Sequence, residues 1–207
     1  MKAAIIGTGP GGLYAALAAS KHNIQIDLFE KRSVGEGIGC GEGIFDSLNI
    51  MKKPGRGLMH PVDEIVLQGR GCYTFPLGRH RKLWMLDRRT WQQDLAACAV
   101  NRGVNLHEHT KITPAHLQQM TKEYDWIIDA SGAPSITSRL KGFSNDYFKN
   151  YLLAYQVVLA GDFRAVWPHI KIIFLQDIPA DCQPAYAWIF PKDANLANVG
   201  VVCSVQG

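Results

Sequence analysis

Residues 2–30 of this 207-residue chain read KAAIIGTGPGGLYAALAASKHNIQIDLFE, and this stretch decides the fold. Lys2–Ile6 is a short apolar run without helical spacing, typical of a strand buried on both faces of a parallel sheet. A glycine-rich turn, Gly7–Gly12, follows, and then a segment with helical spacing. Ile24–Phe29 has the composition of a second strand and ends at Glu30. This order of strand, glycine turn, helix, strand and acid predicts a Rossmann-like α/β domain.

The glycine turn and the acid each have a physical role in binding a dinucleotide. Gly7 permits the tight turn off the strand, Gly9 lets a pyrophosphate approach the backbone, and Gly12 lets the helix pack closely on the strand. The N-terminus of the helix offers free N–H groups to the phosphates. Glu30 lies 18 residues after Gly12, where its carboxylate can accept hydrogen bonds from both ribose hydroxyls. The same carboxylate would repel a 2′-phosphate, so NADP is disfavoured at this site.

The composition argues against several classes of protein. Apolar residues make up 47% of the chain and charged residues 19%, which favours a packed core over disorder. No apolar run approaches the roughly 18 residues that span a bilayer, and the first residues do not resemble a secretory signal, so we expect neither a transmembrane segment nor a signal peptide. The five dispersed cysteines show no CxxC spacing, which argues against disulfides or a zinc site and favours the reducing cytoplasm, with membrane association left open. The net charge of +4 is spread along the chain, so nucleic acid is not an expected partner.

The rest of the chain shows two secondary-structure patterns, one that mixes helices and strands and one made of successive strands. Val104–His107 and Trp126–Ala130 are further candidate parallel strands, and Asp87 can cap a helix that runs to Arg102. Beyond Tyr151 four strand-like stretches follow one another, at residues 152–159, 170–175, 185–190 and 197–202. We therefore predict a discontinuous dinucleotide-binding domain with an inserted, mostly antiparallel sheet. The predicted ranges are residues 1–60 and 87–150 for the first part, and residues 61–86 and 151–207 for the second.

Four stretches carry recognisable patterns: IGTGPGG at residues 6–12 with EKR at 30–32, CGEG at 40–43, RRTWQQDL at 88–95, and YAWIFP at 186–191 followed by Gly200. Together they resemble the geranylgeranyl reductase family, flavoproteins of the p-hydroxybenzoate hydroxylase-like fold. The first pattern resembles the family's FAD adenosine site, the second its Cys-Gly motif beside the flavin ring, and the third a segment that contacts FAD. The fourth resembles the family's substrate motif and is the most specific, because three aromatic residues at that spacing before a glycine are rare.

The resemblance implies a three-layer, glutathione-reductase-type FAD-binding domain with an inserted substrate domain. It implies FAD contacts from Gly7, Gly9, Pro10, Gly11, Gly12, Glu30, Lys31, Arg32, Cys40, Gly41, Gly43, Arg88, Ala130 and Gly132. It implies substrate contacts from Tyr186, Trp188, Phe190, Pro191 and Gly200. The three aromatic residues alternate with others and so share one face of a strand, which is either core packing or the wall of an apolar tunnel. The resemblance favours the tunnel.

The function that the resemblance implies is an FAD-dependent oxidoreductase that reduces C=C bonds of a prenyl lipid or prenyl diphosphate. Reduced flavin would deliver the hydride, and NAD(P)H or another electron donor would reduce the flavin. Cys40 is either an ordinary turn residue or a catalytic proton donor beside the flavin, with solvent as the alternative proton source. A flavin-dependent aromatic monooxygenase or a halogenase-like enzyme shares the fold and is the first alternative. A non-catalytic nucleotide- or lipid-binding fragment is the second.

Two polar clusters have both plain and functional interpretations. Arg79–Lys82 is the densest basic run; it is either a solvated hairpin end or a contact for an anionic partner, which could be a lipid headgroup, a substrate diphosphate or a membrane surface. His107 and His109 could suggest a metal site, but no third ligand is apparent, so we interpret them as ordinary surface or core histidines.

The sequence lacks one segment that the resembled family has. That later Gly-Asp-Ala segment holds the ribityl and pyrophosphate groups, and the single Gly-Asp pair here, Gly161-Asp162, is followed by Phe163 and lies among strands. We therefore expect a piece of a longer protein or a natural truncation. The oligomeric state stays open.

Overall fold

The computed structural model describes residues 1–46, 55–77, 82–145 and 151–204, which form two compact units. The first unit comprises Met1–Ile38 and Arg88–Phe148, and the second comprises Gly39–Asp87 and Lys149–Gly207. Described residues of the 39–46 and 55–60 stretches belong to the second unit, because β3 (Gly43–Phe45) and β4 (Leu58–Val62) both pair with β7 (Leu83–Leu86).

The first unit is built on a parallel sheet. β1 (Lys2–Ile6) pairs in parallel with β2 (Gln25–Phe29) and with β9 (Trp126–Asp129), and β2 pairs with β8 (Asn105–His107). The strand order is therefore β8-β2-β1-β9. Four of the five residues of β1 are buried, as its unbroken apolar sequence predicts for a central strand.

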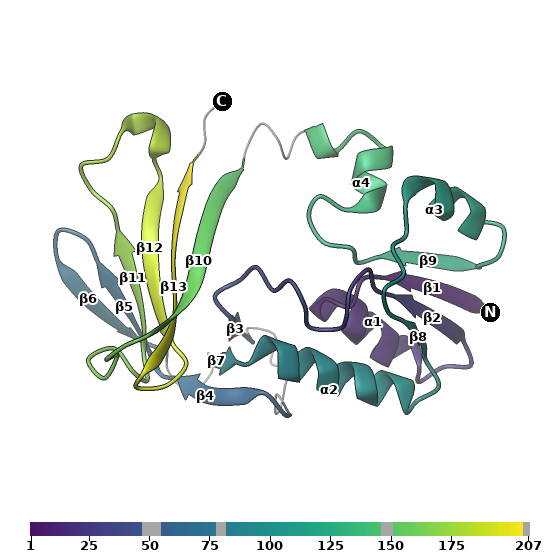
Figure 1. Ribbon diagram of the computed structural model, residues 1–207, viewed down its shortest axis with the longest axis horizontal. Helices are drawn as coiled ribbons and strands as arrows, with labels where there is room; N and C mark the ends of the chain where they lie inside the picture. Colours follow the sequence, from purple (N-terminus) through teal and green to yellow (C-terminus); the bar gives the residue numbers. More distant parts are fainter. Residues whose placement is uncertain (47–54, 78–81, 146–150, 205–207) are drawn as a thin grey trace. The chain divides into compact units, whose positions relative to one another are not determined.

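Helices lie on both sides of this sheet (Figure 1). On one side, α1 (Pro10–Ala19) and α2 (Arg88–Val100) pack against the sheet through a hydrophobic core. On the other side lie α3 (Pro114–Met120) and the short α4 (Ile136–Leu140). This arrangement confirms the predicted three-layer, Rossmann-like architecture. The core residues shared by the sheet and the first two helices include Ile5, Leu13, Ala16, Ile26, Leu28, Ala96 and Ala99.

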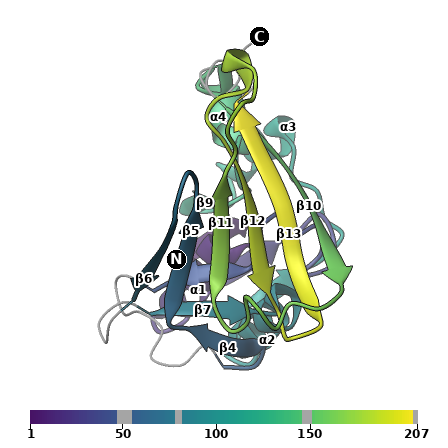
Figure 2. The same cartoon turned by 90° about the vertical axis from the view of Figure 1, so that its left-hand side faces the viewer.

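The second unit contains the predicted mostly antiparallel sheet. Its six strands follow the order β10-β13-β12-β11-β5-β6, and every pairing is antiparallel except that of β11 with β5 (Figure 2). The strands are β10 (Leu152–Ala160), β13 (Leu196–Ser204), β12 (Ala185–Pro191), β11 (Ile170–Phe174), β5 (Glu64–Gln68) and β6 (Cys72–Pro76). A 3-10 turn, η1 (Ala180–Cys182), precedes β12. A buried cluster that includes Val62, Leu83, Met85 and Ile170 joins this sheet to the three-stranded sheet β3-β7-β4.

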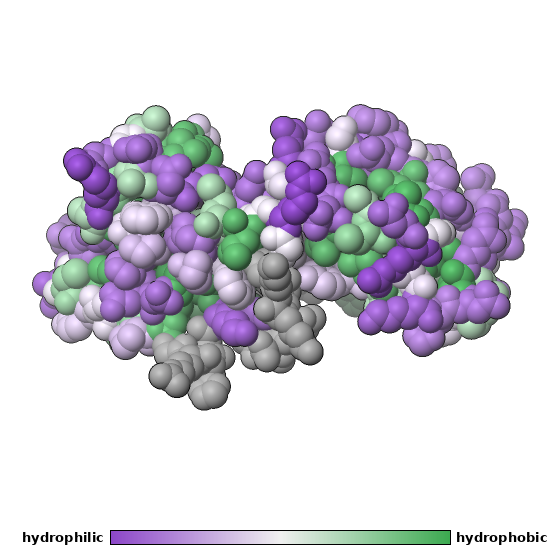
Figure 3. Space-filling model, turned by 90° about the horizontal axis from the view of Figure 1, so that it is seen from below, coloured by the Kyte–Doolittle hydropathy of each residue, from purple (hydrophilic) through white to green (hydrophobic). Residues whose placement is uncertain are grey.

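The surface is mixed in character. The face seen in Figure 3 carries hydrophobic residues interspersed among hydrophilic ones. Edge strand β10 is exposed along almost its whole length, with Leu153 59% and Tyr155 70% exposed. Within the described ranges, no helix is both long and apolar enough to cross a bilayer. The basic run at residues 79–82 lies outside the described residues except for Lys82.

Candidate functional site

Two glycines of the nucleotide turn are required by close packing. Gly7 has a φ of +99°, and a Cβ there would lie 2.4 Å from the carbonyl oxygen of Ala130. A Cβ on Gly12 would lie 1.9 Å from the carbonyl oxygen of Gly7. The turn is therefore pressed between the start of α1 and the end of β9, where Ala130 N–H also donates to the carbonyl of Ile6 at 2.9 Å. Only glycine fits at these two positions.

The other two glycines of the turn face open space. No atom lies within 4 Å of a Cβ built on Gly9 or Gly11. Gly9 is the N-cap of α1 and Pro10 is its first residue, and no side chain caps the helix. An uncapped helix N-terminus beside an open surface of glycine backbone is suited to an anionic group such as a pyrophosphate.

The carboxylate of Glu30 is fixed at the end of β2 by the turn itself. Its Oε2 accepts hydrogen bonds from the Thr8 backbone N–H at 2.9 Å and from the Thr8 hydroxyl at 2.8 Å. Its Oε1 accepts from the Arg32 N–H at 3.1 Å. A carboxylate has about four acceptor positions, so capacity remains for ribose hydroxyls.

A glutamine that the sequence analysis missed supports the same turn. Gln92 on α2 is buried and donates through Nε2 to the carbonyl of Thr8 at 2.9 Å. Its Oε1 accepts from Arg88 Nη2 at 3.0 Å, and the Arg88 guanidinium lies 5.5 Å from the ring centre of Trp91. Arg88, a predicted FAD contact, is thus linked to the nucleotide turn through Gln92. The signal in the sequence was an uncharged polar residue next to Trp91 on the buried face of a helix.

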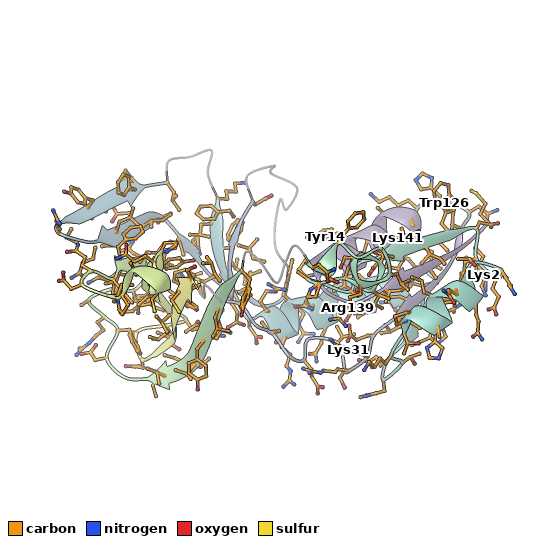
Figure 4. All side chains as sticks on the ribbon, turned by 90° about the horizontal axis from the view of Figure 1, so that it is seen from above. Lys2, Tyr14, Lys31, Trp126, Arg139 and Lys141 are labelled. Atoms are coloured by element: carbon orange, nitrogen blue, oxygen red, sulfur yellow. The ribbon has the colours of Figure 1, made fainter. Side chains whose placement is uncertain are left out.

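A cavity of about 110 Å³ lies beyond the turn, at the carboxyl ends of the parallel strands. Of the predicted FAD contacts, Gly7, Glu30 and Lys31 line it. Figure 4 shows Lys31 and Arg139 in the same region of the first unit. Ile6 and Phe29, at the ends of β1 and β2, also line the cavity. The other lining residues were not predicted from the sequence and come from the segments after β8 and β9 and from α4: Thr110, Lys111, Ile112, Ser131, Pro134, Ile136 and Arg139. Three of the lining side chains are cationic and one is a carboxylate, so the lining carries a net positive charge.

Asp129 organises the loop that lines this cavity. Its carboxylate accepts from the N–H and hydroxyl of Ser131 at 3.1 and 2.5 Å, and from the N–H and hydroxyl of Thr137 at 2.7 and 2.6 Å. Burial acts to raise the pKa of Asp129, but these hydrogen bonds outweigh it and lower the pKa to about 2. Gly132, another predicted contact, has a φ of +99° and faces open space.

The second unit presents the predicted aromatic face. Tyr186, Trp188 and Phe190 lie along β12 with ring centres 6.3 and 6.2 Å apart, and Phe174 on β11 extends the row at 6.5 Å from Tyr186. Gly200 lies opposite Trp188 on β13. Trp188 is buried, and its indole N–H donates to Oδ1 of the fully buried Asn198 at 2.8 Å.

Two of the recognised patterns meet inside this unit. A Cβ on Gly41 would lie 2.7 Å from Cδ2 of Phe190 and 3.3 Å from Nε1 of Trp188, so the backbone after Cys40 rests directly on the aromatic face. A Cβ on Gly43 would make only ordinary contact with Phe190, at 3.5 Å. Cys40 itself is half-buried.

The far end of the aromatic strand is held by a histidine. Pro191 is fully buried, and its carbonyl oxygen is 2.9 Å from Nε2 of His60 on β4. Pro191, one of the predicted substrate contacts, is therefore packed inside the unit, and its carbonyl group links β12 to β4.

The two candidate histidines have local partners. Nε2 of His107 lies 3.2 Å from Oδ1 of Asp27, and Nε2 of His109 lies 3.2 Å from the hydroxyl of Ser33. In the described part of the chain, no group of three or more His, Cys, Asp or Glu side chains is arranged to hold a metal ion.

Comparison with known proteins agrees with these features. Residues 5–37 match the family model of an NAD(P)-binding Rossmann-like domain. A digeranylgeranylglycerophospholipid reductase from Thermoplasma acidophilum is 24% identical to 98% of this chain. This chain is similar to geranylgeranyl reductases. The solved structure of a geranylgeranyl bacteriochlorophyll reductase-like protein from the same organism covers 98% of the chain with a TM-score of 0.71 and 19% identity.

The same fold also serves other flavin enzymes. A flavin-dependent halogenase of known structure, CmlS, matches 98% of this chain with a TM-score of 0.70 and 18% identity. The chain spans 56% of the Thermoplasma reductase, 56% of the reductase-like structure and 41% of the halogenase. It therefore corresponds to about half the length of the relatives that it matches.

Proposed function

We propose that this chain is part of an FAD-dependent oxidoreductase that reduces C=C bonds of a prenyl chain. The observation that carries the proposal is the contact between the Cys40–Gly41 backbone and the aromatic face of Trp188 and Phe190. This contact brings a segment suited to the flavin ring next to a surface suited to an apolar chain. Gly41 and Trp188, which meet there, are 147 residues apart in the sequence. The relation to geranylgeranyl reductases supports the same assignment.

The residues of the first unit fit a dinucleotide such as FAD. The open backbone of Gly9 and Gly11 and the uncapped start of α1 would hold the pyrophosphate. Glu30, held in place by Thr8, would accept the ribose hydroxyls, and the cavity lined by Lys31 would take the adenine. The carboxylate of Glu30 argues against a 2′-phosphate at this position.

The residues of the second unit fit an apolar substrate and a proton donor. Bound FAD in its reduced form supplies the hydride in this chemistry. The aromatic row from Phe190 to Tyr186 would bind and orient the prenyl chain and exclude water from it. Cys40 would donate the proton to the carbon next to the one that receives the hydride, so that hydride and proton together saturate the double bond. NAD(P)H or a small electron carrier would reduce the flavin.

The substrate class in this proposal is a prenyl lipid or a prenyl diphosphate. Such a molecule resides in or near a membrane, so a protein in the cytoplasm would have to meet it at the membrane surface. The long exposed strand β10, which carries Leu153 and Tyr155, is consistent with apolar contacts of this kind.

The first test is the visible absorption spectrum of the purified protein after loading with excess FAD and removal of unbound cofactor. Flavin absorption that travels with the protein, followed by saturation of prenyl lipids under anaerobic conditions, is the expected result. The two outcomes that contradict the proposal are the absence of bound flavin in the full-length gene product and prenyl turnover that requires oxygen.

A monooxygenase or halogenase is the second candidate function, because the halogenase matches the fold about as closely as the reductase-like structure does. Both alternatives need reduced flavin to react with oxygen. Oxygen consumption that depends on an aromatic substrate, without release of peroxide, would favour them. A protein that binds ADP but not the isoalloxazine part of FAD would favour the non-catalytic alternative.

A further inference from the structure

A buried ion pair lies beside the contact between the Cys40 loop and the aromatic strand. Glu42 precedes β3 and Lys192 follows β12, and the carboxylate Oε2 of Glu42 pairs with Nζ of Lys192. The two side chains are only 9% and 12% exposed. Burying charges in this way is costly unless each is paired, so the fold must bring these two residues together closely.

The position of this pair ties together two segments that are distant in the sequence. Glu42 is two residues after Cys40, and Lys192 is two residues after Phe190. Gly41, next to Glu42, lies against the Phe190 ring: a Cβ built on Gly41 would be 2.7 Å from Cδ2 of Phe190. The ion pair therefore stands at the edge of the surface where Cys40 would meet a substrate.

The backbone at Glu42 is also held in an uncommon conformation. Its φ is +65°, a region that residues with a side chain rarely adopt. Its carbonyl oxygen accepts from the N–H of Leu86 at the end of β7, at 3.1 Å. A left-handed residue that is anchored by both its backbone and its side chain indicates a loop whose shape is imposed by its surroundings.

We propose that Glu42 and Lys192 are positioning residues that hold the Cys40–Gly41 backbone on the aromatic face of β12. The pair holds the loop that carries Cys40 against Trp188 and Phe190, where the prenyl chain of the proposed function would lie. Lys192 is not a ligand for a substrate diphosphate, because its charge is matched by Glu42 and enclosed. The link to catalysis rests on the proposed function. The holding of the Cys40 loop by the Glu42–Lys192 pair, called the clamp below, does not.

The test measures the reactivity of Cys40 in the protein without substrate. Cysteine modification by N-ethylmaleimide is followed by peptide mass spectrometry, with the exposed Cys72 and Cys98 as references in the same molecule. Lys192→Met and Glu42→Gln each remove one charge and keep the approximate size. We expect either change to raise the Cys40 rate by about tenfold while the two reference rates stay constant, because only the loop is released.

Further variants separate positioning from general stability. Lys192→Arg, and the exchange Glu42→Lys with Lys192→Glu, keep an ion pair and should return the Cys40 rate toward that of the native protein. Lys171→Met, on the same sheet, is the control and should change nothing. A Cys40 rate unchanged in both single variants, or equal increases at all three cysteines, would overturn the proposal, as would failure of both restored pairs.

The outcome is independent of whether the protein reduces prenyl chains. If the labelling result is as expected and no prenyl lipid is reduced, the proposed function fails and the clamp stands. If reduction is observed, Lys192→Met should lower kcat much more than it changes KM, because the lysine does not touch the substrate.

Discussion

Gly200 and Trp188 lie opposite each other on neighbouring strands, and the indole ring occupies the space that a side chain on Gly200 would need. A Cβ at Gly200 would lie 2.1 Å from Cζ2 of the ring. The resemblance to geranylgeranyl reductases implies a substrate contact for this glycine. The structure shows a direct physical requirement for it: the glycine lets the Trp188 ring lie flat on β13 and reach Asn198.

Gly200→Ala should therefore displace Trp188. We expect the free energy of unfolding to fall by about 1–3 kcal/mol, because the added methyl group overpacks a buried ring and strains its hydrogen bond to Asn198. Denaturant unfolding followed by tryptophan fluorescence measures this. Gly161→Ala is the matched control, since its nearest atom, in Phe163, would be 3.5 Å away. Equal stability of the two variants would contradict the packing argument.

Gly12 and Gly9 should separate folding from nucleotide binding. Gly12→Ala places a Cβ 1.9 Å from the carbonyl oxygen of Gly7 and should lower the free energy of unfolding by about 3 kcal/mol. Gly9→Ala meets no atom and should leave the free energy of unfolding within about 0.5 kcal/mol of the native value. It should still weaken FAD binding by about tenfold, because the methyl group takes space beside the helix N-terminus that a pyrophosphate needs. Thermal unfolding and a flavin titration on the same samples provide both measurements, and a loss of stability in Gly9→Ala would refute the assignment.

Glu30→Ala should weaken FAD binding on the order of 1.5–3 kcal/mol through the loss of hydrogen bonds to the ribose. Thr8→Val keeps the carboxylate but removes the hydroxyl that donates to it at 2.8 Å, and it should have a smaller effect in the same direction. Fluorescence titration with FAD measures both, with the exposed Glu123→Gln as the control. Unchanged affinity in Glu30→Ala would remove this residue from the binding site.

Asp129 should make the first unit sensitive to acid. Its pKa of about 2 in the folded protein lies below the ordinary value of 3.8, so the folded state favours the charged form. This contribution, about 1–2 kcal/mol after allowance for solvent screening, is fully present above about pH 4 and is lost as the pH falls from 4 to 2.

Asp129→Asn should therefore lower the free energy of unfolding at pH 7, and the difference from the native protein should shrink below pH 4. Urea unfolding at several pH values is the measurement. If the two proteins differ in free energy of unfolding by the same amount at pH 7 and at pH 2.5, ionisation of the Asp129 carboxyl group is not the cause of the difference.

Cys40→Ser tests the proton donor in the proposed reaction. If the thiol donates the proton, turnover of a prenyl lipid should fall by about 100-fold with flavin binding unchanged. The half-buried Cys203 on β13 provides the control variant, Cys203→Ser. Full activity of Cys40→Ser would assign the proton to solvent.

Local patterns were sufficient for much of the secondary structure. The apolar run of β1 and the glycines before α1 each specify their element through short-range chemistry, and each element forms where predicted. The three-residue strand β3 was not predicted, because its glycine-rich sequence has no period of its own. It forms because β7 supplies hydrogen-bonding partners from a segment about 40 residues away.

Short-range sequence patterns predicted the Rossmann-like order of elements, the position of the glycine turn and the alternation that places Tyr186, Trp188 and Phe190 on one face, since all of these depend on neighbouring residues. Only the tertiary structure showed that Gln92 supports Thr8, that Asp129 shapes the cavity loop and that Glu42 pairs with Lys192. These contacts join residues on separate elements, and a buried polar group acquires its partner only when packing brings the two together. For the same reason, the Cys40 loop and the aromatic strand come into contact only in the folded chain.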